Sequence, residues 1–135
     1  MGEAGFARFT LEEIQQRYGE STPRRQFLFR RLQTVTRLLS ETGSWRHLYL
    51  FGSFTTAKPT PGDLDCLAVM AAGFTTVNLP AHLLDVFEHD LCRLYYHADV
   101  FSVTEMVGRE HIEAMLAVFS HDRHGALQPM VEVTV

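Results

Sequence analysis

Two aspartates separated by one leucine, Asp63 and Asp65, stand at the start of an otherwise apolar segment that ends at Met70. In a strand, residues two apart point to the same side, so the two carboxylates should project together. Neighbouring carboxylates repel unless a cation neutralises them, and an all-oxygen site suits Mg²⁺ or Mn²⁺. The simpler alternative is that Gly62 and Asp63 form a turn and that Asp65 caps a nearby backbone.

Two other features come from neighbouring predicted strands. Gly52 and Ser53 directly follow the strand predicted over 45–51. A glycine there lets a ligand approach the backbone, and amides of the next turn with the Ser53 hydroxyl can hold phosphate oxygens. A third acid, Asp99, lies in the strand predicted over 95–103. Together these strands would contribute one phosphate-binding turn and three carboxylates.

This arrangement resembles a known signature. A Gly-Ser pair, nine intervening residues and an Asp-Leu-Asp at 63–65 are similar to the signature of the DNA polymerase beta-like nucleotidyltransferase superfamily, with Asp99 at the place of its third carboxylate. The sequence looks most like the short, single-domain (minimal) nucleotidyltransferases of prokaryotes. The resemblance covers about residues 45–103.

The resemblance implies a role for each of these residues. Gly52 and Ser53 would hold the phosphates of a nucleoside triphosphate, and Asp63 and Asp65 would bind a pair of divalent ions, Mg²⁺ or Mn²⁺. Asp99 would complete the metal site and help to deprotonate the attacking hydroxyl. The expected reaction moves a nucleoside monophosphate to a hydroxyl acceptor and releases pyrophosphate.

The sequence departs from the family in its positive charge. Many minimal members have an Arg-rich stretch after Gly-Ser and a Ser before the first metal-binding Asp, whereas here Lys58 is the only cation between Gly-Ser and Asp63, and Gly62 precedes that aspartate. We expect Lys58 to reach the triphosphate. The thin charge supports the alternative of a degenerate, non-catalytic member that acts as an interaction or antitoxin-like protein. A plain structural domain would instead require the three aspartates to lie far apart.

The resemblance leaves the acceptor open among a small molecule such as an aminoglycoside, an RNA end and a hydroxyl on a partner protein. Some minimal nucleotidyltransferases similar to this one nucleotidylate a toxin partner, so the enzymatic and antitoxin-like alternatives overlap.

Helical periodicity and capping signals predict the elements before this core. Thr10 and Glu13 form a capping box for a short helix that Gly19 ends. Thr22 and the following proline begin a longer helix that ends near Gly43.

The predicted core continues with strands over 45–51 and 64–70. We expect a helix from Pro80 with an inward face, a strand over 95–103, a last helix capped by Thr104 and a strand over 130–135. The inward face of the helix from Pro80 is formed by Leu84, Phe87, Leu91 and Leu94, and that of the last helix by Ile112, Met115, Leu116 and Phe119.

These elements predict one α+β domain over 1–135, with a mixed sheet of about four or five strands and helices on one side. Its parts are N-terminal helices (1–44), the signature core (45–103), and a helix with a final strand (104–135). Its 135 residues, 46% of them hydrophobic, suffice for one core.

The composition also limits the partners and the cellular compartment that we expect for the protein. A net charge of −4 argues against nonspecific wrapping of nucleic acid. Cys66 and Cys92 pattern as core, and the sequence has neither a signal-peptide profile nor an apolar run long enough for a membrane helix. We therefore expect a reduced, soluble, cytoplasmic protein.

Other polar residues have ordinary interpretations. Arg24, Arg25, Arg30 and Arg31 are typical of a solvated helix face, with docking of nucleic acid or an acidic partner as the alternative. The run His121 to His124 is typical of a polar turn, with metal binding as the alternative. On strand geometry His97 should share the face of Asp99.

Overall fold

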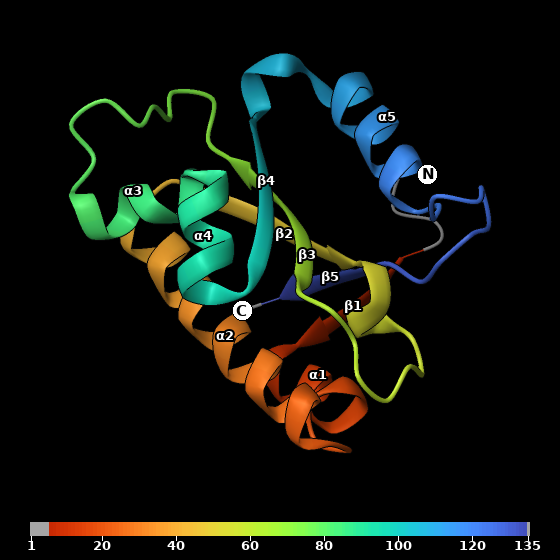
Figure 1. Cartoon of the computed structure of the whole chain (residues 1–135). Coiled ribbons are helices and arrows are strands. Elements are labelled where there is room, and N and C mark those ends of the chain that lie inside the picture. Colours follow the sequence, from red (N-terminus) through yellow and green to blue (C-terminus); the bar gives the residue numbers. More distant parts are fainter. Residues whose placement is uncertain (1–5, 135) are drawn as a thin grey trace.

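The computed structural model describes residues 6–134, and a five-stranded mixed sheet in the order β1-β5-β2-β3-β4 forms its centre (Figure 1). β3 is parallel to β4 and β1 to β5, whereas β2 is antiparallel to both of its neighbours. The strands are β1 (Ala7–Thr10), β2 (Trp45–Phe51), β3 (Leu64–Met70), β4 (Ala98–Thr104) and β5 (Val131–Thr134). The α+β prediction is confirmed.

Within residues 6–134, five α-helices and two 3₁₀ turns connect these strands. They are α1 (Leu11–Tyr18), α2 (Pro23–Glu41), η1 (Gly52–Thr55), α3 (Ala81–Phe87), α4 (His89–Tyr96), η2 (Glu105–Val107) and α5 (Arg109–Phe119). The predicted capping box of Thr10 and Glu13 is present, and the Thr22 side chain accepts a hydrogen bond from the Arg25 amide. These local signals place the starts of α1 and α2 correctly.

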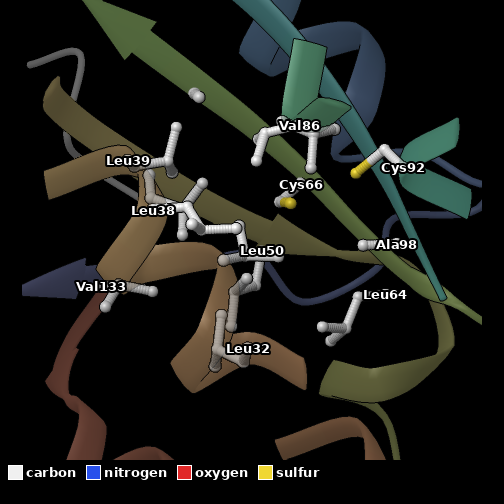
Figure 2. Packing of buried hydrophobic residues seen from close by; sticks show 14 of the residues in the cluster. Leu32, Leu38, Leu39, Leu50, Leu64, Cys66, Val86, Cys92, Ala98 and Val133 are labelled. Atoms are coloured by element: carbon white, nitrogen blue, oxygen red, sulfur yellow. The ribbon is translucent and has the colours of Figure 1, made fainter. Parts of the chain in front are cut away.

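The larger hydrophobic core lies between one face of the sheet and α1 to α4. Leu50, Leu64 and Cys66 of the sheet meet Leu32 of α2 and Cys92 of α4 there (Figure 2). Each of these side chains is almost fully buried. Because successive strand residues alternate, the intervening residues, Asp65 among them, point to the other face.

The second face of the sheet is covered by α5 (Figure 1). Tyr49, Phe51 and Leu67 pack there against Leu116 and other apolar residues of α5. The expectation that helices cover only one side of the sheet is therefore wrong. The apolar periodicity of α5 agrees with its packing, but the apolar stripe of a helix does not reveal which sheet face it covers.

Around Glu88 the predicted single helix is two helices. Glu88 has an extended conformation (φ −97°, ψ 106°) between α3 and α4. The predicted inward face is wrong in part: Phe87 packs against the core, but Leu84 and Leu94 are exposed while Cys92 is buried. Because the extended residue Glu88 interrupts the helical backbone, one periodic stripe does not describe both helices.

β4 begins at Ala98, because the chain is helical as far as Tyr96 and His97 then adopts a left-handed conformation (φ 52°). The expected strand start at 95 was therefore wrong, and His97 is not part of the strand that carries Asp99. Thr104 caps η2, and α5 starts only after Gly108.

The edge strand β1 was not predicted. It is four residues long and mostly exposed, so it lacks an alternating apolar pattern. The last predicted strand is confirmed over Val131–Thr134, and Val135 lies outside the described residues. No helix within 6–134 combines the length and apolar character required to cross a membrane.

Candidate active site

Asp65 and Asp99 lie side by side where β3 and β4 begin. They are register partners on these parallel strands, and both point to the sheet face that α5 covers further along. Burial raises the pKa of Asp65 to about 7, with further contributions from the charge of Asp99, a hydrogen bond between the two carboxyl groups and the charge of Asp63. The expected adjacency of carboxyl groups is therefore present for Asp65 and Asp99.

Asp63 lies in the loop just before β3, as the turn interpretation held, but its charge still acts on Asp65. Its Oδ1 is 3.5 Å from the Arg24 guanidinium and 3.8 Å from His97 Nδ1. Because β3 begins at Leu64, the expectation that Asp63 and Asp65 project together from one strand is wrong, whereas Asp65 and Asp99 are adjacent.

Gly52 brings the end of β2 against Asp65. Phe51 is the register partner of Asp65, and the next residue, Gly52, turns the chain with φ +80°. A Cβ at Gly52 would collide with the Asp65 carboxylate. The position therefore requires glycine for its backbone conformation and for the space that the carboxylate occupies.

Ser53 and Lys58 lie in the segment that follows. The Ser53 hydroxyl accepts a hydrogen bond of 3.0 Å from the Gly62 amide, so it ties the start of η1 to the residue before Asp63. Lys58 is exposed, and its carbonyl is held from within the protein. The Ser53 hydroxyl proton stays free to be donated to an oxygen ligand, because the bond to Gly62 uses the oxygen as acceptor.

Arg25 of α2 holds the segment from Phe54 to Lys58 by hydrogen bonds to its carbonyl groups. Its guanidinium is almost fully buried and donates hydrogen bonds to the carbonyls of Tyr18, Phe54, Thr56 and Lys58, at 2.5 to 3.1 Å. Desolvation lowers the pKa of Arg25. The expectation of a solvated face is wrong here, because the fold places carbonyls of the loop over the start of α2.

The rest of the loop is fastened to α2 as well. The Thr22 hydroxyl donates to Pro59 O at 2.9 Å, and Arg24 donates to Pro61 O at 3.0 Å and to Gly62 O at 3.2 Å. Arg24 is half-buried and reaches Asp63 with the same group, so it too departs from the solvated-face interpretation. The N-terminal turn of α2 thus fixes the loop that presents Asp63.

Two side chains of α4 contact Asp99 and were not predicted. Arg93 Nε is 2.9 Å and His89 Nε2 is 3.1 Å from Asp99 Oδ1. The two are one helical turn apart, so both reach the same carboxylate. Their i, i+4 spacing in a helix that leads into the strand of Asp99 was the signal that could have identified them.

The fit to a divalent cation rests on the donor set. No group of three or more histidine, cysteine, aspartate or glutamate side chains in residues 6–134 is already arranged around a metal position. The adjacent carboxyl groups of Asp65 and Asp99, with Asp63 near, are nevertheless hard oxygen donors of the kind that Mg²⁺ and Mn²⁺ prefer. Their mutual repulsion is the energetic reason for a cation to bind. The residues therefore fit such an ion.

Residues outside this site behave as expected. Cys66 and Cys92 are buried and unpaired; burial raises the pKa of both thiols, that of Cys92 to about 12. His121 to His124 form an exposed polar turn, in which Asp122 Oδ1 accepts from the His124 and Ala126 amides. The polar-turn interpretation is confirmed.

A cavity of about 420 Å³ lies elsewhere on the same sheet face, between the sheet and α5. It is lined by Phe6, Arg8, His47, Tyr49, Val69, Glu105, Arg109, Ile112, Glu113 and Leu116. It contains none of the predicted site residues and is therefore separate from the aspartate site.

Residues 2–134 match the family of unknown function DUF6932, and the chain belongs to this family. No curated protein and no solved structure matches the chain.

Proposed function

We propose that this protein is a metal-dependent nucleotidyltransferase that transfers a nucleoside monophosphate from a nucleoside triphosphate to a hydroxyl acceptor. The observation that carries the proposal is the adjacency of Asp65 and Asp99 beside Gly52, whose missing side chain leaves room for the Asp65 carboxylate. Repelling carboxyl groups beside a glycine turn suit a site for a divalent cation and a phosphate.

Each residue of the site has a task in this reaction. Asp63, Asp65 and Asp99 would hold Mg²⁺ or Mn²⁺, which supplies positive charge for the triphosphate and the departing pyrophosphate. Gly52 and Ser53 orient the phosphates. The acceptor oxygen forms a bond to the α-phosphorus, the bond from that phosphorus to the β-phosphate oxygen breaks, and Asp99 helps to remove the hydroxyl proton.

Calorimetry of nucleoside triphosphate binding tests the proposal, with Mg²⁺ or Mn²⁺ present and with the metal removed by a chelator. Binding by the wild type should require the metal, and the Asp63→Asn, Asp65→Asn double variant should lose it. Glu12→Gln, at an exposed carboxylate of α1, is the matched control and should bind like the wild type. Equal affinity in the double variant and the wild type would refute the assigned site.

Turnover is tested separately with radiolabelled nucleoside triphosphate and a panel of acceptors: aminoglycosides, RNA ends and co-purified partner proteins. Asp63→Asn or Asp65→Asn should abolish transfer while the thermal unfolding transition stays cooperative. Unchanged turnover in either single variant would sink the assignment.

The internal ion pairs favour a second candidate function, a non-catalytic interaction or antitoxin-like protein. Asp63 pairs with Arg24, and Asp99 with Arg93, so protein cations already neutralise part of the site. Such a protein would bind a partner whether or not Asp65 is intact. Partner capture by wild type and Asp65→Asn, combined with the nucleotide titration, separates the two functions.

A further inference from the structure

The segment after Gly52 and Ser53 carries little positive charge, although a triphosphate brings several negative charges to the site. Lys58 is its only cation, and it is exposed. Two arginines approach the aspartates from helices instead, Arg24 from α2 and Arg93 from α4. The structure thus supplies cationic side chains from elements that precede and follow the predicted phosphate loop.

These two arginines differ in how firmly they are held. Arg24 uses Nε and one terminal nitrogen on the carbonyls of Pro61 and Gly62, so its main contacts are with the loop itself. Arg93 donates Nε to Asp99 and has a side chain that is 53% exposed. One of its terminal nitrogens is 3.4 Å from His89 Nε2. Arg93 is therefore the arginine that can change partners.

Asp99 is also the carboxylate whose surroundings must change when a divalent cation binds. Its Oδ1 is in contact with both Arg93 and His89. A cation shared by Asp65 and Asp99 would compete with these groups for the same oxygens. A guanidinium displaced from Asp99 would lie at the edge of the site, and its planar donors match phosphate oxygens.

We propose that Arg93 is a nucleotide-positioning residue: it neutralises Asp99 in the metal-free protein and binds the triphosphate once a divalent cation replaces it on Asp99. This inference rests on the proposed function and identifies the protein side chain whose positive charge binds the phosphates. It also makes a prediction of opposite sign for two ligands, because Arg93 competes with the metal but assists the nucleotide.

The experiment is calorimetry on Arg93→Gln and wild type with three probes: Mn²⁺ alone, Mg-ATP, and inorganic tripolyphosphate in the presence of Mg²⁺. Mg-ATP and tripolyphosphate should each bind about tenfold more weakly to the variant, since a charge-assisted phosphate contact is lost. Mn²⁺ alone should bind more tightly to the variant than to the wild type, because the guanidinium that competes for Asp99 is gone. Arg93→Lys, which keeps the charge, should recover part of the nucleotide affinity.

Arg37→Gln is the matched control, because Arg37 is an exposed arginine of α2 that pairs with Glu41, four residues further along the helix. It should leave all three affinities unchanged. Circular dichroism and thermal melting of each variant verify the fold.

Five outcomes contradict the inference alone: unchanged Mg-ATP affinity in Arg93→Gln, unchanged Mn²⁺ affinity in that variant, weaker Mg-ATP with unchanged tripolyphosphate, parallel loss of Mn²⁺ and nucleotide, or no recovery in Arg93→Lys. Parallel loss would mean that Arg93 merely supports the structure of the site. Failure of the proposed function looks different, because Mg-ATP then binds neither wild type nor variant, or binds the Asp63→Asn, Asp65→Asn protein normally.

Discussion

Asp65 and Asp99 are register partners on the parallel strands β3 and β4, at the point where both strands begin. Burial, the charge of Asp99, a hydrogen bond between the two carboxyl groups and the charge of Asp63 together raise the pKa of Asp65 to about 7. The folded protein without a cation therefore binds a proton at Asp65 that the unfolded chain, with an ordinary aspartate pKa of 3.8, releases at lower pH.

The first prediction concerns stability and pH. Because the folded state holds more protons at Asp65, the contribution of Asp65 to the free energy of unfolding should fall as the pH rises from about 4 to about 7 and change little above that. Asp65→Asn removes the charge, so at about pH 8 with chelator the variant should be about 1 to 3 kcal/mol more stable than wild type. Urea unfolding at several pH values measures this difference.

The same series has an internal check. The stability difference between Asp65→Asn and wild type should shrink at about pH 5, where wild-type Asp65 is protonated. Mn²⁺ should stabilise wild type near pH 8 and have a smaller effect on the variant. A constant difference at every pH would show that Asp65 titrates as an ordinary aspartate.

The second prediction concerns Gly52. Gly52→Ala should cost more than Gly43→Ala, although both glycines have positive φ, because a Cβ at Gly43 meets nothing within 4 Å whereas a Cβ at Gly52 meets Asp65. The control should cost about 1 kcal/mol from backbone conformation alone. The Gly52 variant should in addition lose metal-dependent nucleotide binding, because its Asp65 carboxylate is displaced.

A double-mutant cycle separates these two costs. In an Asp65→Ala background, Gly52→Ala should cost nearly the same as Gly43→Ala, since the carboxylate that meets the new methyl group is gone. Chemical denaturation supplies the energies. If the extra cost of Gly52→Ala persists without the Asp65 carboxylate, the contact with that group does not explain it.

The third prediction concerns the hydrogen bonds that Arg25 donates to the carbonyls of Phe54, Thr56 and Lys58. Arg25→Met should lower the free energy of unfolding by about 3 kcal/mol, because it leaves several carbonyls of a part-buried loop without donors. Amide hydrogen exchange should accelerate between residues 54 and 62. Arg30→Met, at an exposed position of the same helix, is the control and should change either quantity little. Similar amide hydrogen exchange rates in both variants would show that the hydrogen bonds of Arg25 do not hold this loop.

The fourth prediction concerns the thiols. Cys66 and Cys92 are buried, and the pKa of Cys92 is raised to about 12, so neither should react readily with a disulfide reagent in the native protein. Labelling should accelerate with urea as the protein opens. Ala117→Cys, at an exposed position of α5, provides a thiol that should label at once. Rapid labelling of wild type without denaturant would contradict the burial of both cysteines.

Local sequence signals predicted much of the fold. β2 and β3 begin and end at the predicted residues, because each is a short apolar run bounded by turn residues. The alternation of strand residues also predicted that Asp65 points away from Cys66, as it does. These features depend on neighbours in the sequence, so the sequence alone contains them.

Features that depend on distant partners were missed. The burial of Arg25 is decided by carbonyls of a loop that begins about thirty residues later, and nothing in the helical pattern distinguishes it from the exposed Arg30. The break at Glu88 carries no proline or glycine to mark it. A nearer contact, that of Arg93 with Asp99 six residues later, was missed because the strand was expected to begin at 95 instead of at Ala98.

The position of β5 between β1 and β2 affects how the protein is made. β5 follows every other strand in the sequence, yet it pairs with the first strand on one side and with β2 on the other. On the ribosome, β2, β3 and β4 can pair while β2 still presents an open edge, and β1 has no strand to join. The sheet is complete only after residues 131–134 leave the exit tunnel. Nascent chains that stall earlier therefore expose the edge of β2, on which chaperones or other nascent chains can add a strand.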